Sequence, residues 1–148
     1  MKKFISILSL GVVLFILAAC TSTAPQAGSE SDLKGTSWVV TGYDDGSQTV
    51  TDVLAGTTLT ATFAEDGTIT GNSGCNDYNG PYTVTGNQIK IGPLASTMKA
   101  CEQAVMDQEQ QYLAALSTAA TYRIDGSKLE LRTADGALAA TFQKAAGQ

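Results

Sequence analysis

Short runs of β-prone residues, separated by turn signals, recur along most of this 148-residue chain. In residues 57–63, Leu59, Ala61 and Phe63 fall on one side and threonines alternate with them. This period of two is expected of a half-buried strand. Similar runs occupy residues 36–42, 68–71, 82–84, 88–91, 121–124, 128–132 and 138–142. Because short turns rich in Gly, Asp and Asn connect many of them, and such turns cannot join parallel neighbours, the sequence predicts an antiparallel meander.

One segment departs from this pattern. Residues 102–117 contain neither Gly nor Pro, and Val105, Tyr112, Leu113 and Leu116 fall on one face of a helix. We therefore predict an α+β fold that is mainly β, either an antiparallel meander sheet or a partly open β-barrel, with one covering helix at about residues 102–117. We expect five aromatic residues in packing roles rather than in a ligand site: Trp38, Tyr43, Tyr78, Tyr82 and Tyr122.

The first twenty residues predict export. A basic head, residues 1–3, precedes an uncharged run over residues 4–19, and Leu17-Ala18-Ala19 stands directly before Cys20. This order is typical of a secretory signal peptide. Small residues followed at once by cysteine resemble the lipobox of bacterial lipoproteins, which implies cleavage before Cys20 and a lipid on its thiol.

Processing at this site divides the chain into three parts. Residues 1–19 are then a cleaved signal peptide, residues 20–32 are the lipidated cysteine and a flexible tether, and residues 33–144 form one domain. The expected localisation is the cell envelope, with the domain lipid-anchored to the membrane on the extracytoplasmic side. Plain secretion and a retained membrane anchor are the alternatives.

Two cysteines remain for the domain. If lipid occupies Cys20, then Cys75 and Cys101 lie in an oxidising compartment, where an even number of remaining cysteines indicates a disulfide. Two free thiols are the alternative, and a catalytic or metal-bound pair is a third. We expect no cofactor and no metal.

Charge and composition restrict the function. The chain has 9 Lys+Arg and 14 Asp+Glu, and loss of Lys2 and Lys3 with the signal peptide leaves seven basic residues against 14 acidic ones. An acidic domain repels phosphates, so nucleic acid is not expected as a partner. Histidine is absent, which excludes Ser-His, Cys-His and His-metal chemistry. Asp77 is the best lone catalytic carboxylate, and we expect the chain not to be an enzyme.

The densest unusual stretch is residues 71–82, which carries three Gly and three Asn. Since both residue types tolerate left-handed φ, we expect tightly bent backbone here. Such a loop could cradle an anion with its amides, or it could be only a tight crossing that positions Cys75. The candidate binding surface of this loop consists of Asn72, Asn76, Asp77, Tyr78 and Asn79.

Motifs in four places resemble one known family. They are Leu33-Lys34-Gly35-Thr36-Ser37-Trp38, Gly74-Cys75-Asn76 with Tyr78, Gly80 and Tyr82, residues 92–98 running into Cys101, and residues 122–129 with Phe142. Together they resemble the META (HslJ-type) domain over about residues 33–142. Glu102 is a small departure, because the family often has Pro after the second cysteine. The resemblance implies an antiparallel β domain with one helix, in an envelope protein linked to stress tolerance or secretion, without established enzymatic activity.

Two functions follow as hypotheses. The first is a membrane-tethered, non-enzymatic domain that contacts an unknown envelope protein or a peptidoglycan-side component. The second is a carrier that binds a lipid or small apolar ligand within the β-domain, which needs an apolar cavity of ~300 Å³ or more.

Lipidation gives the first test. We expect palmitate to label the expressed full-length chain and Cys20→Ala to abolish the label, because the thiol is the attachment point. The measurement is radiolabelled or alkyne-palmitate incorporation after gel separation. A label that persists in the Cys20→Ala variant would contradict the assignment.

Overall fold

The structure, a computed structural model, describes residues 33–146. The predicted signal peptide, Cys20 and the predicted tether lie outside this range. Within it, no helix is both long and apolar enough to cross a membrane.

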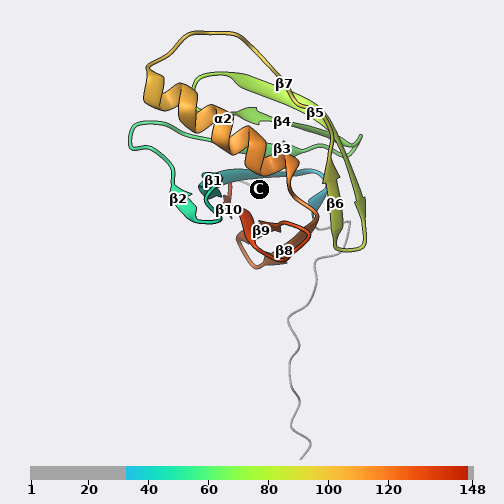
Figure 1. The fold of residues 1–148 in the computed structure, drawn as a ribbon. Helices are drawn as coiled ribbons and strands as arrows, with labels where there is room; N and C mark the ends of the chain where they lie inside the picture. Colours follow the sequence, from blue (N-terminus) through green and yellow to red (C-terminus); the bar gives the residue numbers. More distant parts are fainter. Residues whose placement is uncertain (1–32, 147–148) are drawn as a thin grey trace, which may run out of the picture.

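Ten strands and one complete helix make up this part of the chain (Figure 1). The strands are β1 Thr36–Asp44, β2 Val50–Asp52, β3 Thr60–Phe63, β4 Thr68–Asn72, β5 Asp77–Thr85, β6 Gln88–Ile91, β7 Ala95–Ser96, β8 Thr121–Asp125, β9 Lys128–Arg132 and β10 Leu138–Lys144. Helix α2 spans Gln103–Ser117. All strand pairs are antiparallel, so the predicted fold class is confirmed.

The strands close into a ring. Hydrogen-bonded neighbours follow the order β10-β9-β8-β6-β5-β4-β3-β1-β2, and β1 also pairs with β10, which leaves β2 and β7 attached outside the ring. The pairing between β6 and β8 is the weakest, with Gln88 opposite Thr121 as its one registered position. The pairing of β1 with β10 is longer and shifts register between Val40 and Gly42. Irregularities of this kind bend a strand and help a sheet to curve.

The predicted alternation of inward and outward side chains is confirmed in β3. Ala61 and Phe63 are fully buried, as is Leu59 just before the strand, while Thr60 and Thr62 lie at intermediate exposure. The turn that follows needs Gly67, whose φ is +83°, a conformation that glycine adopts without strain. All five aromatic residues assigned to packing are buried: Trp38, Tyr43, Tyr78, Tyr82 and Tyr122.

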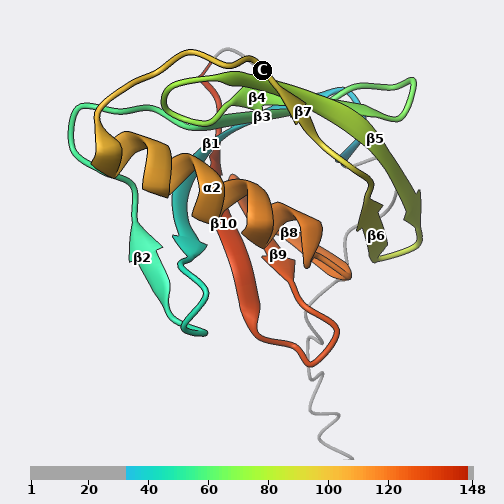
Figure 2. The ribbon, with the colours of Figure 1, turned by 45° about the horizontal axis from the view of Figure 1, so that its top comes forward.

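Helix α2 lies across the mouth of the ring, between the β3–β5 side and the β8–β10 side (Figure 2). It contacts β1, β10 and β6. Tyr112 and Leu116 point into the core and are fully buried, while Val105 and Leu113 are only partly covered. The helix begins after Glu102, whose extended backbone makes it the N-cap residue. The predicted helix, at about residues 102–117, therefore began one residue too early.

Bent backbone was expected over residues 71–82, but the bent part is shorter in the structure. Strand β5 begins at Asp77, and the irregular backbone is limited to residues 73–76. Only Gly74 in this stretch has a left-handed backbone, with φ +105°. The physical reason is alternation: Tyr78, Tyr82 and Val84 are buried with period two, which favours a strand despite the Asn and Gly between them.

A disulfide joins the β4–β5 connection to the segment that precedes α2. The Cys75–Cys101 bridge is present, with the two Cα atoms 6.1 Å apart and a sequence separation of 26. The predicted pairing is thus found in the structure. It fixes the start of α2 beside the loop that follows β4.

We expect Cys75→Ser and Cys101→Ser to destabilise the domain equally under oxidising conditions, by about 3–4 kcal/mol each, since either change opens the same loop. The double variant should cost little beyond either single one. Urea denaturation with and without reductant measures this, and reduced wild type is the matched control. Clearly unequal single effects would contradict a shared bridge as the main contribution.

Candidate functional site

The connection between β4 and β5 passes very close to α2. Gly74 makes this approach possible, because a Cβ built on it would lie 2.8 Å from Nε2 of Gln108. The connection is closed by the backbone N–H of Ser73, which donates to the carbonyl of Asn76 at 2.8 Å. The Gly-Cys-Asn motif is therefore required by packing: Gly74 allows contact with the helix, Cys75 forms the bridge, and Asn76 turns inward.

Glu109 places a carboxylate beneath this connection. Its side chain comes from the second turn of α2, and the residue is only 7% exposed. Oε2 accepts hydrogen bonds from Ser73 Oγ at 2.6 Å and from the Asn76 N–H at 2.9 Å, and Oε1 accepts from Asn76 Nδ2 at 3.0 Å. A carboxylate oxygen pair that only accepts fits these three donors.

Asn76 connects this carboxylate to the disulfide segment. Its residue is 1% exposed. Oδ1 accepts from Thr97 Oγ1 at 2.7 Å and from the Lys99 N–H at 2.8 Å, while Nδ2 also donates to the Lys99 carbonyl at 3.2 Å. One amide thus joins the β4–β5 connection, α2 and residues 97–99. We call Ser73, Asn76 and Glu109 the Asn76–Glu109 cluster.

A second buried polar contact is made by Gln108, the residue directly before Glu109. Oε1 of Gln108 accepts from the Leu54 N–H at 2.8 Å, and its Nε2 donates to Thr57 Oγ1 at 3.0 Å. The helical pattern in the sequence identified the apolar stripe but not Gln108 and Glu109. A signal was present for Glu109, because it lies four residues after Val105 and three before Tyr112, on the same face.

Tyr78 and Tyr112 form a buried hydroxyl pair at 2.9 Å, and Tyr78 donates to the carbonyl of Thr60 at 2.9 Å. Burial raises the pKa of both phenols above the ordinary value of 10.0; at Tyr78 the hydrogen bond with Tyr112 opposes this in part. At Tyr82, burial raises the pKa to about 12, and the nearby carboxylates of Glu65 and Asp66 add to the shift. These phenols stay protonated at neutral pH and cannot act as bases there.

The outer face of β3, β4, β5 and β7 carries a polar groove of about 620 Å³. Its lining is rich in hydroxyl and amide groups and consists of Thr60, Thr70, Gly71, Asn72, Asp77, Tyr78, Asn79, Ala95, Ser96 and Thr97. The carboxylate of Asp77 accepts from Asn72 Nδ2 at 2.9 Å and lies 3.8 Å from the Lys99 ammonium. Both charges are well exposed, so this ion pair contributes little to stability.

The structure divides the five residues of the predicted loop surface. Asn72, Asp77 and Asn79 contribute to the groove, with Asp77 and Asn79 exposed. Asn76 and Tyr78 point inward and form internal hydrogen bonds, although part of Tyr78 reaches the groove floor. Whatever binds this face would meet three of the five side chains directly.

Three other acidic residues of the described range serve local turns. Asp44 accepts from the Gly46 N–H, Asp45 from Ser47, and Asp66 from the Thr68 N–H. Hydrogen bonds from Ser47 lower the pKa of Asp45. Residues 33–146 hold no group of three or more His, Cys, Asp or Glu that could bind a metal ion. Asp44, Asp45 and Asp66 thus each stabilise a turn.

Comparison with known families decides the affiliation. The sequence model of the META domain matches residues 31–146, which is most of the chain. The chain belongs to the META domain family. Among curated proteins, none matches it.

Solved structures share the META domain fold at low sequence identity. An NMR structure of a protein from Burkholderia xenovorans is 23% identical, with a TM-score of 0.66 and 99% of each chain covered. A second NMR structure is 20% identical, with a TM-score of 0.56, covering 76% of this chain and 92% of the other. A crystal structure of a DUF4847 family protein from Bacteroides vulgatus is 17% identical, with a TM-score of 0.55, covering 77% of this chain and 95% of the other. At these identities the likeness concerns the fold alone.

Substitution of the central amide tests the role of the cluster in this META domain. In Asn76→Asp, an acceptor replaces the Nδ2 donor and faces the Glu109 carboxylate, so we expect a loss of about 3 kcal/mol or more in the free energy of unfolding. The measurement is urea denaturation with the disulfide intact. The matched control is Asn79→Asp, an identical change at an exposed position, expected within about 0.5 kcal/mol of wild type. Equal effects at the two positions would contradict the structural role of Asn76.

Proposed function

We propose that this chain is a lipid-anchored, non-enzymatic envelope protein whose META domain acts by contacting another envelope protein, in stress tolerance or secretion. The observation that carries the proposal is how the domain uses its reactive groups. Asn76, Gln108, Glu109, Tyr78 and Tyr112 are buried and bonded to one another or to the backbone. The buried polar groups are thus occupied in holding the fold.

The N-terminal pattern and the bridge support the same proposal. The signal-peptide and lipobox pattern ending at Cys20 predicts anchoring outside the cytosol. The Cys75–Cys101 disulfide is the state that such a compartment maintains. An exported, tethered domain whose buried polar groups are internally paired offers its surface, rather than an interior site, to partners.

The carrier alternative is favoured by one observation. A groove of about 430 Å³ between the β6 end and α2 is lined by apolar Ile91, Pro93, Leu94 and Leu113, together with Lys90, Gly92 and Ser117. Against it, the centre of the ring is filled by large side chains that are almost completely buried, including Trp38, Phe63, Tyr112, Tyr122 and Phe142. The interaction function therefore has the stronger support.

Two measurements on the mature, detergent-extracted protein separate the alternatives. We expect native mass spectrometry to show the acylated polypeptide without a further retained lipid, and lysine-directed cross-linking in intact cells to give a reproducible protein–protein adduct. A stoichiometric bound lipid that disappears with Leu113→Asp would favour the carrier instead. Catalytic turnover that disappears with Asp77→Ala would contradict the non-enzymatic assignment.

A further inference from the structure

We propose that residues 97–101, the Met98 segment, are the surface by which this chain binds a second protein, with Met98 entering an apolar pocket of that partner. This inference deepens the interaction function proposed above and rests on it. It follows from the exposure of Met98, the way its backbone is fixed, the charges around it and its position relative to the start of the domain.

Met98 is the most exposed large apolar side chain of the described residues, at 98%, against 38% for Leu54. Every residue from Ala95 to Cys101 is exposed. A single exposed apolar residue on a soluble surface needs no explanation by itself. Met98 differs because the chain holds it in this position.

The backbone around Met98 is fixed on both sides. The Thr97 N–H donates to the Asp77 carbonyl at 3.0 Å, and Thr97 Oγ1 donates to Asn76 at 2.7 Å. Lys99 exchanges two hydrogen bonds with the Asn76 amide, and Cys101 is bonded covalently to Cys75. A buried amide and a buried carboxylate therefore serve to immobilise an exposed segment. Immobilisation before binding removes an entropic cost of association.

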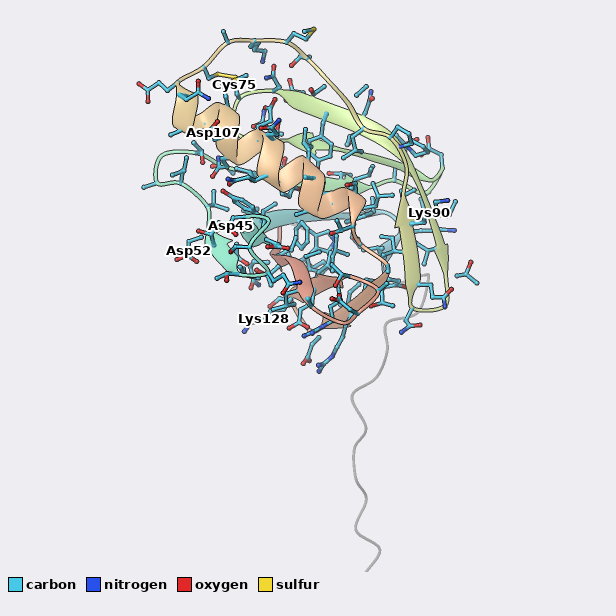
Figure 3. All side chains as sticks on the ribbon, in the orientation of Figure 1. Asp45, Asp52, Cys75, Lys90, Asp107 and Lys128 are labelled. Carbon is cyan, nitrogen blue, oxygen red and sulfur yellow. A yellow bond between two sulfur atoms is a disulfide. The ribbon has the colours of Figure 1, made fainter. Side chains whose placement is uncertain are left out.

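The chemistry of the segment specifies the partner. Methionine is flexible and polarisable, and it adapts to apolar pockets of varied shape. Next to it, Lys99 and Asp77 form an exposed pair, 61% and 65% accessible. Glu102 and Asp107, further along the chain, are two more exposed carboxylates. Figure 3 shows Asp107 on the same side of the molecule as Cys75. The excess negative charge calls for a basic rim around the partner's pocket, and it disfavours anionic lipid headgroups.

The position of the segment also disfavours the bilayer. The described chain begins next to the β3–β4 turn, where the Gly35 N–H donates to the Phe63 carbonyl at 2.7 Å. The Met98 segment adjoins the β4–β5 connection, at the other end of β4. In Figure 1, the segment between β7 and α2 arcs across the side away from the blue start of the chain. A tether attached at residue 33 therefore joins the domain at the end of β4 opposite the Met98 segment.

Oxidation footprinting tests whether Met98 is covered in the cell. The full-length chain is treated with dilute hydrogen peroxide in intact cells of the native host and, in parallel, as purified lipidated protein, and sulfoxide is quantified by peptide mass spectrometry. We expect Met98 to oxidise at least tenfold more slowly in cells. Met106, partly buried on α2, is the internal control. Its oxidation rate in cells should equal its oxidation rate in the purified protein. Equal oxidation of Met98 in both settings overturns the proposal.

Two further conditions identify the occupant. Met98 should stay reactive when the purified lipidated protein is placed in phosphatidylethanolamine–phosphatidylglycerol vesicles. It should also stay reactive when the protein concentration is raised. Protection by vesicles alone would assign the surface to the bilayer, and protection by concentration alone would assign it to a second copy. Either result overturns the proposal.

Variants test the side chain itself. With a benzophenone amino acid in place of Ala100, we expect an in-cell protein adduct that persists in Met98→Leu and falls at least tenfold in Met98→Gln, as for loss of a buried anchor residue. An adduct unchanged in Met98→Gln overturns the role of Met98. Palmitate labelling keeps the two proposals apart: a labelled Cys20 with unprotected Met98 contradicts this inference alone, and an unlabelled Cys20 with protected Met98 contradicts the anchoring alone.

Discussion

The side-chain amide of Asn76 is where three distant parts of the chain meet. It donates to a buried carboxylate on α2, accepts from Thr97 and Lys99, and follows directly after the bridged Cys75. Buried networks of this type are stabilising only when every member is paired. Here the pairing is complete within the chain, so the cluster fixes one arrangement of loop, helix and disulfide segment. The geometry of the polar groove and of the Met98 segment depends on it.

The helix and the ring depend on each other in a similar way. A ring of short strands with a single registered pair between β6 and β8 has little sheet pairing at that point. Tyr112 and Leu116 of α2 fill the interior, and helix contacts reach β1, β6 and β10. Burial of these apolar side chains compensates for hydrogen bonds that the sheet does not make there. The domain is consequently one packed unit rather than a sheet with an attached helix.

Much of this architecture was visible in the sequence, and the exceptions have physical causes. Alternation in residues 57–63 and the β-prone run at residues 68–71 predicted β3 and β4, because these patterns are local properties of the sequence. Strand β5 was missed in its first half because Asn and Gly between Tyr78 and Tyr82 suggested bent backbone, whereas burial of the tyrosines decided the conformation. Strands β2 and β7 have three and two residues, which is too short for an alternating pattern to be visible in the sequence. The binding-loop residues were predicted as one surface, but Asn76 turns inward. Its hydrogen-bond partners lie on α2 and in residues 97–99, far away in sequence, and no local pattern specifies them.

The pairing of β1 with β10 places the first and last strands of the domain side by side, with Trp38 opposite Lys144. A chain emerging from a ribosome or from a translocation channel presents β1 first and β10 last. Until the final strand has emerged, β1 lacks one of its neighbours and the ring stays open. Completion of this ring is therefore a late event that waits for β10.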